Sequence, residues 1–181
     1  MPKVLALSGG VGGAKLVAGL ADVLPPDSLT VLTNTADDFT HLGLRICPDL
    51  DSVLYALSGQ NDTDRGWGVA NESWQFLDQL KALGREEDAW FQLGDRDLAL
   101  HISRSQWLAE GLTLTEVCAE LTQRMQLPLE LMPMCDQPVA TIVHTNEGDL
   151  PFQDYFVRRQ CEPVIQGVSF AGAEEALPNQ Q

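Results

Sequence analysis

Glycines and a lysine follow the first apolar run of the sequence and could hold a phosphate group. The segment reads Ser8-Gly9-Gly10-Val11-Gly12-Gly13-Ala14-Lys15. Glycine lets backbone N–H groups approach a phosphate closely, and the next helix points the positive end of its dipole there. Leu16 after Lys15 excludes a Walker A loop. We expect phosphate binding at Gly10, Gly12, Gly13 and Lys15, the alternative being a turn that only packs helix against strand.

Aspartates after the second apolar run form another candidate site. Asp37 and Asp38 lie in the segment that begins at Asn34, and Asp49 and Asp51 follow Pro48. Ligands collect at the carboxyl ends of parallel strands, so this loop and the glycine turn should face one crevice. Carboxylate oxygens suit Mg²⁺ that bridges phosphates. A solvated loop is the alternative, in which Asp49 only caps a helix.

Charged side chains also gather between Phe91 and Arg104. Asp95 is placed to cap a helix that carries Arg96, His101 and Arg104. Arginine suits forked recognition of phosphate or carboxylate, and a salt-bridged surface helix is the alternative. Trp67 lies in a glycine-flanked loop, where its ring either walls a planar ligand or packs in the core.

The apolar pattern places these clusters on alternating strands and helices. A strand over Pro2–Leu7, a helix over Ala14–Leu24 and a strand over Leu29–Leu32 make a βαβ unit. Further helices are predicted over Asp51–Leu57, Asn71–Leu83 and Asp97–Leu108. Thr113 and Glu116 form a capping box that opens a helix ending near Gln126.

The last third of the sequence is strand-like. Strands are predicted over Leu129–Met132, Val139–Thr145, Phe152–Val157 and Val164–Phe170, with a hairpin turn over Asn146–Asp149. The whole pattern predicts one α/β domain, a Rossmann-like three-layer fold. Its sheet is mostly parallel and carries a β-hairpin toward the C-terminal part.

The strongly acidic composition limits the kinds of partner that the protein can bind. The 181 residues carry 11 Lys and Arg against 26 Asp and Glu, a formal net charge of -15. Such a surface repels phosphate backbones and anionic lipids, so we expect neither nucleic acid nor membrane as a partner. Four scattered cysteines and three histidines show no zinc spacing. No signal peptide or membrane span is recognisable, and a cytoplasmic location is predicted.

The motifs occur in an order that resembles the 2-phospho-L-lactate transferase (CofD/FbiA) family of coenzyme F-420 biosynthesis. The resemblance runs over essentially the whole chain and is most specific between Leu93 and Arg104. The motifs that carry it are Ser8-Gly-Gly-Val-Gly-Gly-Ala-Lys15, Asn34-Thr-Ala-Asp-Asp38, Pro48-Asp-Leu-Asp51, Trp67-Gly-Val-Ala-Asn71, Leu93-Gly-Asp-Arg-Asp97 and His101-Ile-Ser-Arg104.

The resemblance implies a magnesium-dependent transferase. Such an enzyme passes a phospholactyl or phosphoenolpyruvyl group from a guanosine diphosphate-linked donor to the ribityl hydroxyl of the deazaflavin 7,8-didemethyl-8-hydroxy-5-deazariboflavin (Fo), and GMP leaves. Phosphoryl transfer needs mainly alignment and charge neutralisation. The resemblance also implies small-molecule substrates and a homodimer. Family members are longer, so residues 1–181 should correspond to their N-terminal part and turn over no substrate alone.

The resemblance also assigns roles to the candidate residues. The glycine turn and Lys15 would approach the diphosphate, and Asn34 would contact substrate. Gln92 and Arg96 would line the acceptor pocket. The aspartates would hold magnesium (Asp37, Asp38, Asp49) or contact the acceptor (Asp49, Asp51), and Asp51 would accept the proton of the attacking hydroxyl.

A binding protein is the competing interpretation. Regulators of the gluconeogenesis-factor type bind nucleotides or sugar nucleotides and share the glycine turn, but should lack the segment from Leu93 to Arg104. A Rossmann dehydrogenase should end its second strand in an acidic residue, where this sequence has Thr33 and Asn34.

Overall fold

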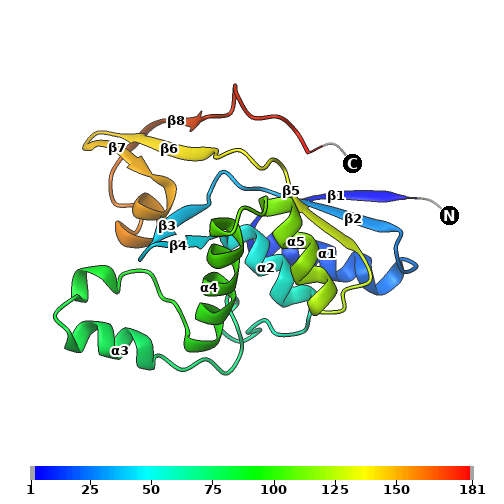
Figure 1. Cartoon of the computed structure of the whole chain (residues 1–181). Helices are drawn as coiled ribbons and strands as arrows, with labels where there is room; N and C mark the ends of the chain where they lie inside the picture. Colours follow the sequence, from blue (N-terminus) through cyan, green and yellow to red (C-terminus); the bar gives the residue numbers. More distant parts are fainter. Residues whose placement is uncertain (1–2, 180–181) are drawn as a thin grey trace.

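A three-stranded parallel sheet supports the N-terminal part of the molecule. The structure is a computed structural model that describes residues 3–179. Strand β1 (Val4–Ser8) pairs with β2 (Leu29–Thr33), and β2 pairs on its other side with β5 (Glu130–Pro133). Pro2, part of the first predicted strand, lies outside the described residues. The parallel sheet confirms the predicted α/β class (Figure 1).

Helices α1 (Gly10–Val23), α2 (Pro48–Leu57) and α5 (Leu114–Arg124) lie together below this sheet in Figure 1. Their apolar residues meet those of the strands in one core, because each helix buries one stripe and each strand one alternate set of side chains. Val17, Val31, Val53 and Val117 are fully buried there. Leu5 and Leu7 of β1 point the other way and are exposed.

Helix α1 begins at Gly10, four residues before the predicted start, so most of the glycine turn forms the first turn of the helix and packs closely against β1. A Cβ atom on Gly13 would lie 2.5 Å from Ser8 Oγ and 3.2 Å from Ser8 Cα. Position 13 therefore requires glycine for the helix to sit against the strand. A Cβ atom on Gly12 would meet nothing within 4 Å.

A short hairpin, which the sequence did not predict, follows β2. Strands β3 (Phe39–His41) and β4 (Leu44–Ile46) are antiparallel and lead directly into α2. Three-residue strands are too short to show an alternating pattern. Helix α2 begins at Pro48, three residues before the predicted start, because proline is well suited to the first helical position. Asp49 is therefore inside the first turn and does not cap the helix.

Two helices in the middle of the chain begin close together, and each is capped by an acidic side chain from the N-terminal region of the other. Helix α3 (Gln75–Ala82) begins later than predicted, and α4 (Asp95–Ala109) begins earlier. The Asp95 carboxylate accepts hydrogen bonds from the N–H groups of Gln75 and Phe76, so it caps α3 and not its own helix. Glu72 accepts from the N–H groups of the first turn of α4. The capping box predicted for α5 is confirmed.

The C-terminal third forms an antiparallel sheet in the order β7-β6-β8. Strand β6 (Ala140–Thr145) pairs with β7 (Gly148–Pro151) and with β8 (Ile165–Ala171). The β6–β7 hairpin has a shorter turn than predicted, because Gly148 and Asp149 belong to the strand. The strand predicted over Phe152–Val157 is wrong, because a π-helical turn (Asp154–Arg158) lies there. Phe152, Tyr155 and Phe156 are spaced as on a helix, which a short apolar run does not distinguish from a strand.

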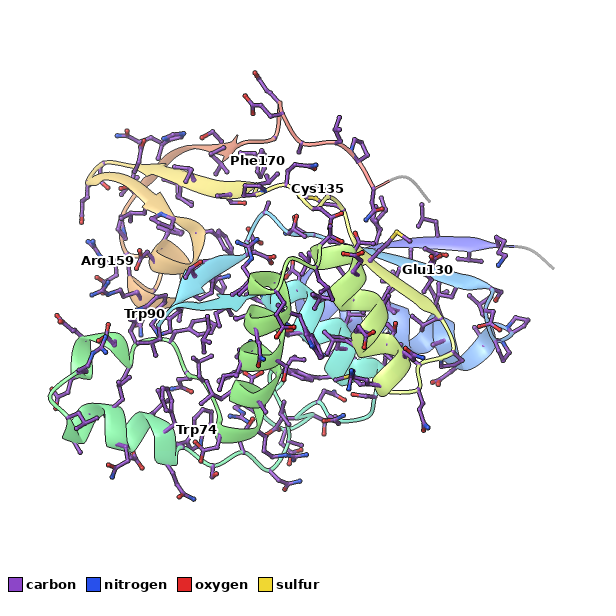
Figure 2. The ribbon with its side chains drawn as sticks, in the orientation of Figure 1. Trp74, Trp90, Glu130, Cys135, Arg159 and Phe170 are labelled. Atoms are coloured by element: carbon purple, nitrogen blue, oxygen red, sulfur yellow. The ribbon has the colours of Figure 1, made fainter. Side chains whose placement is uncertain are left out.

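The π-helical turn packs toward the segment that precedes α4. Figure 2 shows Trp90 of that segment near the turn, and the Arg158 guanidinium lies 5.9 Å from the centre of the Trp90 ring. The turn thus closes one side of the space beyond the carboxyl ends of β1 and β2. Between residues 3 and 179, no helix is long and apolar enough to cross a membrane.

Candidate functional site

A cavity of about 750 Å³ opens at the carboxyl ends of β1 and β2. It is bounded by the glycine turn, the loop after β2, the first turns of α2 and α4, and the π-helical turn. This is the place where parallel sheets bind ligands. The cavity has a polar wall with four aspartates (Asp37, Asp49, Asp51, Asp97) and an aromatic wall (Phe91, Phe152, Phe156).

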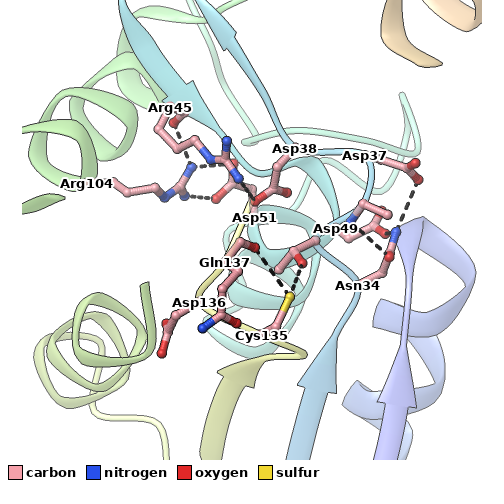
Figure 3. A network of polar contacts seen from close by, with 12 residues as sticks. Asn34, Asp37, Asp38, Arg45, Asp49, Asp51, Arg104, Cys135, Asp136 and Gln137 are labelled. Atoms are coloured by element: carbon pink, nitrogen blue, oxygen red, sulfur yellow. Dashed lines mark hydrogen bonds and ion pairs between the residues drawn. The ribbon is translucent and has the colours of Figure 1, made fainter. Parts of the chain in front are cut away.

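Asn34 joins two of the aspartates on the polar wall. Its Nδ2 atom donates to Asp37 Oδ2 at 3.2 Å and to Asp49 Oδ2 at 2.9 Å, as Figure 3 shows. Thr141 on β6 holds the other oxygen of Asp37 at 2.8 Å. Burial raises the pKa of Asp37, and the negative charge of Asp49 adds to that effect. Two carboxylates are thus held side by side at the cavity.

Asp38 does not reach the cavity. Its side chain is buried on the other side of the loop and pairs with Arg45 Nη2 at 3.2 Å. Burial raises the pKa of Asp38 to about 7. In the described part of the chain, no three His, Cys, Asp or Glu residues are grouped to hold a metal ion. The candidate metal ligands reduce to Asp37 and Asp49, and the geometry separates Asp38 from them.

Asp51 forms a buried ion pair with Arg104. Both of its oxygens face the guanidinium of Arg104, which is fully buried, and Arg104 Nη1 also donates to the carbonyl of Arg45 at 3.2 Å. Burial raises the pKa of Asp51, while Arg104 and His101 oppose that shift. Arg104 is thus internal and not part of a salt-bridged surface helix, as one reading of the sequence had it.

Asp97 lies beside this pair and is held by two neighbours. Tyr55 donates its hydroxyl to Asp97 Oδ1. His101 Nε2 lies 3.1 Å from the same oxygen and its Nδ1 lies 3.7 Å from Asp51 Oδ2, although neither contact is aligned as a hydrogen bond. Burial acts to raise the pKa of Asp97, but His101, Tyr55 and Arg104 together lower it below the usual value.

The glycine turn reaches the cavity only at its beginning. Gly9 and Gly10 line it, and a Cβ on Gly9 would lie 3.3 Å from Asp49 Oδ2. Gly12 and Gly13 do not line it. Lys15 lines a second cavity of about 220 Å³. The two cavities share residues of α1, α2 and the loop at Trp67.

Gln92 lines the main cavity as expected, but Arg96 does not. Arg96 Nη1 donates to the carbonyl of Ala70 at 2.6 Å. This side chain therefore stabilises the loop before α3 and does not line a pocket for the acceptor substrate. Trp67 lies at both cavities with 42% of its surface exposed, so it is not a core residue. The guanidinium of Arg65 covers the Trp67 ring at 4.6 Å.

Sequence reasoning missed several lining residues. Asp97, His101 and Arg104 are spaced as on one helical face, a signal that could have drawn attention to Asp97. Phe152 and Phe156 are also one helical turn apart, and their rings stack at 5.5 Å. Tyr55, Phe91 and Gln153 are among the other lining residues that were not predicted.

Fold and site together define an α/β protein with an acidic, ligand-sized cavity beside a glycine turn at the ends of parallel strands. The chain belongs to the family described as 2-phospho-L-lactate transferase CofD, whose model matches residues 4–181.

Curated relatives carry two transferase names. The chain is 41% identical to the 2-phospho-L-lactate transferase of Methanosarcina mazei, over 96% of this chain and 56% of the relative. It is 39% identical to the phosphoenolpyruvate transferase of Nocardia farcinica, over 98% of this chain and 55% of the relative. The chain thus spans about half the length of the curated relatives that it matches.

A solved structure shares the fold. A crystal structure of a member of the upf0052 family from Bacillus halodurans superposes with a TM-score of 0.59 at 16% identity. The match covers 99% of this chain and 54% of that one. At this identity the likeness supports the fold alone.

Proposed function

We propose that the chain forms the acceptor and metal site of a coenzyme F-420 biosynthesis transferase. The reaction moves a phospholactyl or phosphoenolpyruvyl group from a guanosine diphosphate-linked donor to Fo and releases GMP. The family match and the two names among the relatives support it. The observation that carries it is one cavity that joins an aromatic wall to a carboxylate wall. Fo, a planar ring with a hydroxylated side chain, has the same two parts.

The aromatic wall is the place proposed for the ring. Phe91 is packed edge-on against Phe39 at 4.9 Å, and Phe152 stacks on Phe156. Aromatic pairs of this kind contribute about 1 kcal/mol beyond buried area. With the ring there, the side-chain hydroxyls would extend toward Gln92 and the aspartates, which offer acceptors for them.

The polar wall is the place proposed for Mg²⁺. Asp37 and Asp49 fit the ion, because Mg²⁺ is bound by one or two carboxylates together with substrate phosphates. Of the described residues that line the main cavity, none is Lys or Arg. A diphosphate beside four aspartates would be repelled without a cation. When bound, the ion would supply the charge that neutralises the diphosphate.

The donor phosphates are assigned to the start of α1. Gly9 and Gly10 bring backbone N–H groups to the cavity, and the helix has no acidic residue in its first turn. Helix N-termini favour anions. Lys15 in the adjoining cavity is a second source of positive charge for a donor that extends past Trp67.

The competing function is a regulator that binds a nucleotide without transferring a group. The segment expected to discriminate the two is α4, which brings Asp97 and His101 to the cavity. The binding-only type should lack this segment, so its presence at the cavity favours the transferase.

A transfer assay tests the proposal. The longest form of the protein that its gene encodes is incubated with Fo, each guanosine diphosphate-linked donor and Mg²⁺, and the products are separated by chromatography. We expect GMP and phosphorylated deazaflavin to appear together, and to disappear when the metal is chelated. Absence of both products with both donors would contradict the proposal.

A further inference from the structure

The four aspartates of the cavity differ in how many of their oxygens are already engaged. Asn34 holds Asp37 and Asp49 at the wall proposed for the metal. Arg104 faces both oxygens of Asp51, and the Asp51 side chain is only 7% exposed. A proton on Asp51 would remove the negative charge that compensates a fully buried guanidinium, which is energetically costly.

Asp97 is engaged through one oxygen only. Tyr55 and His101 both face Oδ1, and in the part of the chain that the structure describes no group forms a hydrogen bond to Oδ2. The side chain is 15% exposed, about twice the value of Asp51, and lines the cavity. Its backbone N–H is fixed by Glu72 Oε1 at 2.7 Å, at the first turn of α4. The carboxylate is therefore fixed in orientation while one oxygen remains available.

We infer that Asp97, and not Asp51, accepts the proton of the attacking hydroxyl, an inference that rests on the proposed function. The hydroxyl oxygen of Fo forms a bond to the phosphorus that carries the lactyl or enolpyruvyl group. The bond from that phosphorus to the bridging oxygen breaks, and its electron pair leaves with GMP. The hydroxyl proton moves to Asp97 Oδ2. A positioned aspartate has this role in other phosphoryl transfers.

The neighbours of Asp97 explain why it stays ionised. Tyr55 and Asp51 face it from α2, and His101 and Arg104 face it from α4. His101 and Tyr55 both face Oδ1, and the positive charge of Arg104 adds to their effect in lowering the pKa of Asp97. Tyr55 is thus a positioning residue, because it acts on the reaction through Asp97.

The decisive variant is Asp97→Asn in the longest natural form of the protein. The amide oxygen can still accept from Tyr55, while the oxygen that would take the proton is replaced by NH₂. We expect kcat to fall about 100-fold or more with little change in the KM for Fo. Asp78→Asn, on an exposed position of α3, is the matched control and should retain the wild-type kcat.

A second variant keeps the inference testable if Asp97→Asn folds poorly. Tyr55→Phe removes a hydrogen bond that lowers the pKa of Asp97. The acid limb of the pH–rate profile should therefore move to higher pH, which a merely structural role would not cause. Wild-type-like kcat in folded Asp97→Asn, or an unmoved acid limb in Tyr55→Phe, would overturn the inference. A wild-type protein that makes no product would instead overturn the proposed function, and this inference with it.

Discussion

At the scale of single residues, the floor of the cavity depends on a buried charge. Arg104 is fully buried, and its Nε atom has no hydrogen-bond partner in the described region, so the Asp51 carboxylate is its main compensation. Removal of one partner of a buried pair is costly because the other charge remains buried.

The first prediction concerns this pair. We expect Arg104→Met to lower the free energy of unfolding by about 3 kcal/mol or more, because Asp51 then stays buried without a partner. The double variant with Asp51→Asn should recover part of that loss. Urea denaturation measures both, and a double variant as unstable as the sum of the two single variants would contradict the pairing.

The second prediction uses Asp38. Its pKa is about 7 in the folded protein, above the ordinary value of 3.8, so the folded state binds more protons between these values. The free energy of unfolding should therefore decrease as the pH rises from 4 to 7, on the order of 1 kcal/mol per pH unit at most. Asp38→Asn should show a shallower decrease in urea denaturation. Equal slopes for the variant and the wild type would contradict the buried position.

At the scale of elements, the sequence predicted the helices and strands that have a clear apolar periodicity or recognisable capping residues. Strand β1, helix α1 and strand β2 were expected, as was the capping box of α5, because apolar periodicity and caps are local signals. The β3–β4 hairpin and the π-helical turn could not be predicted, because three-residue strands show no alternation and a short apolar run fits a helix or a strand. The location of the site was predictable in part, since Asn34, Asp37, Asp49 and Gln92 do line one cavity, and their roles there stay a prediction. The partners of Asp38, Asp51 and Arg96 depend on tertiary packing that no local pattern reveals.

The third prediction compares two glycines of one helix. Gly13→Ala should destabilise the fold, because its Cβ would overlap Ser8 where β1 meets α1. Gly12→Ala places its Cβ in open space and should be neutral or stabilising by up to ~1 kcal/mol, since alanine favours helices. Thermal melts should show opposite or clearly unequal shifts. A loss of stability in Gly12→Ala as large as that in Gly13→Ala would contradict this account of the turn.

At the scale of the whole molecule, apolar side chains remain uncovered on one side. Leu5 and Leu7 of β1 are exposed, and so are Val168 and Phe170 of β8. Parallel sheets are ordinarily covered on both faces, and large exposed apolar patches favour association. The homodimer expected from the sequence remains a prediction.

The fourth prediction follows from these patches. Residues 1–181 alone should self-associate in sedimentation experiments, in spite of the net charge of -15. Leu7→Lys, at a side chain 71% exposed, should reduce the association without loss of folded structure. A wild-type chain that is monomeric at all concentrations tested would show that the patches do not drive association.

The claim that the cavity is the acceptor site can be tested most directly by titration of Fo fluorescence with the chain. Phe156 and Phe170 are equally exposed, at 56% and 57%, but only Phe156 lines the cavity. We predict that Phe156→Ala weakens Fo binding about fivefold, which corresponds to about 1 kcal/mol of lost ring contact, while Phe170→Ala binds like the wild type. Equal affinities for the two variants, or no Fo binding by the wild-type chain, would contradict the account.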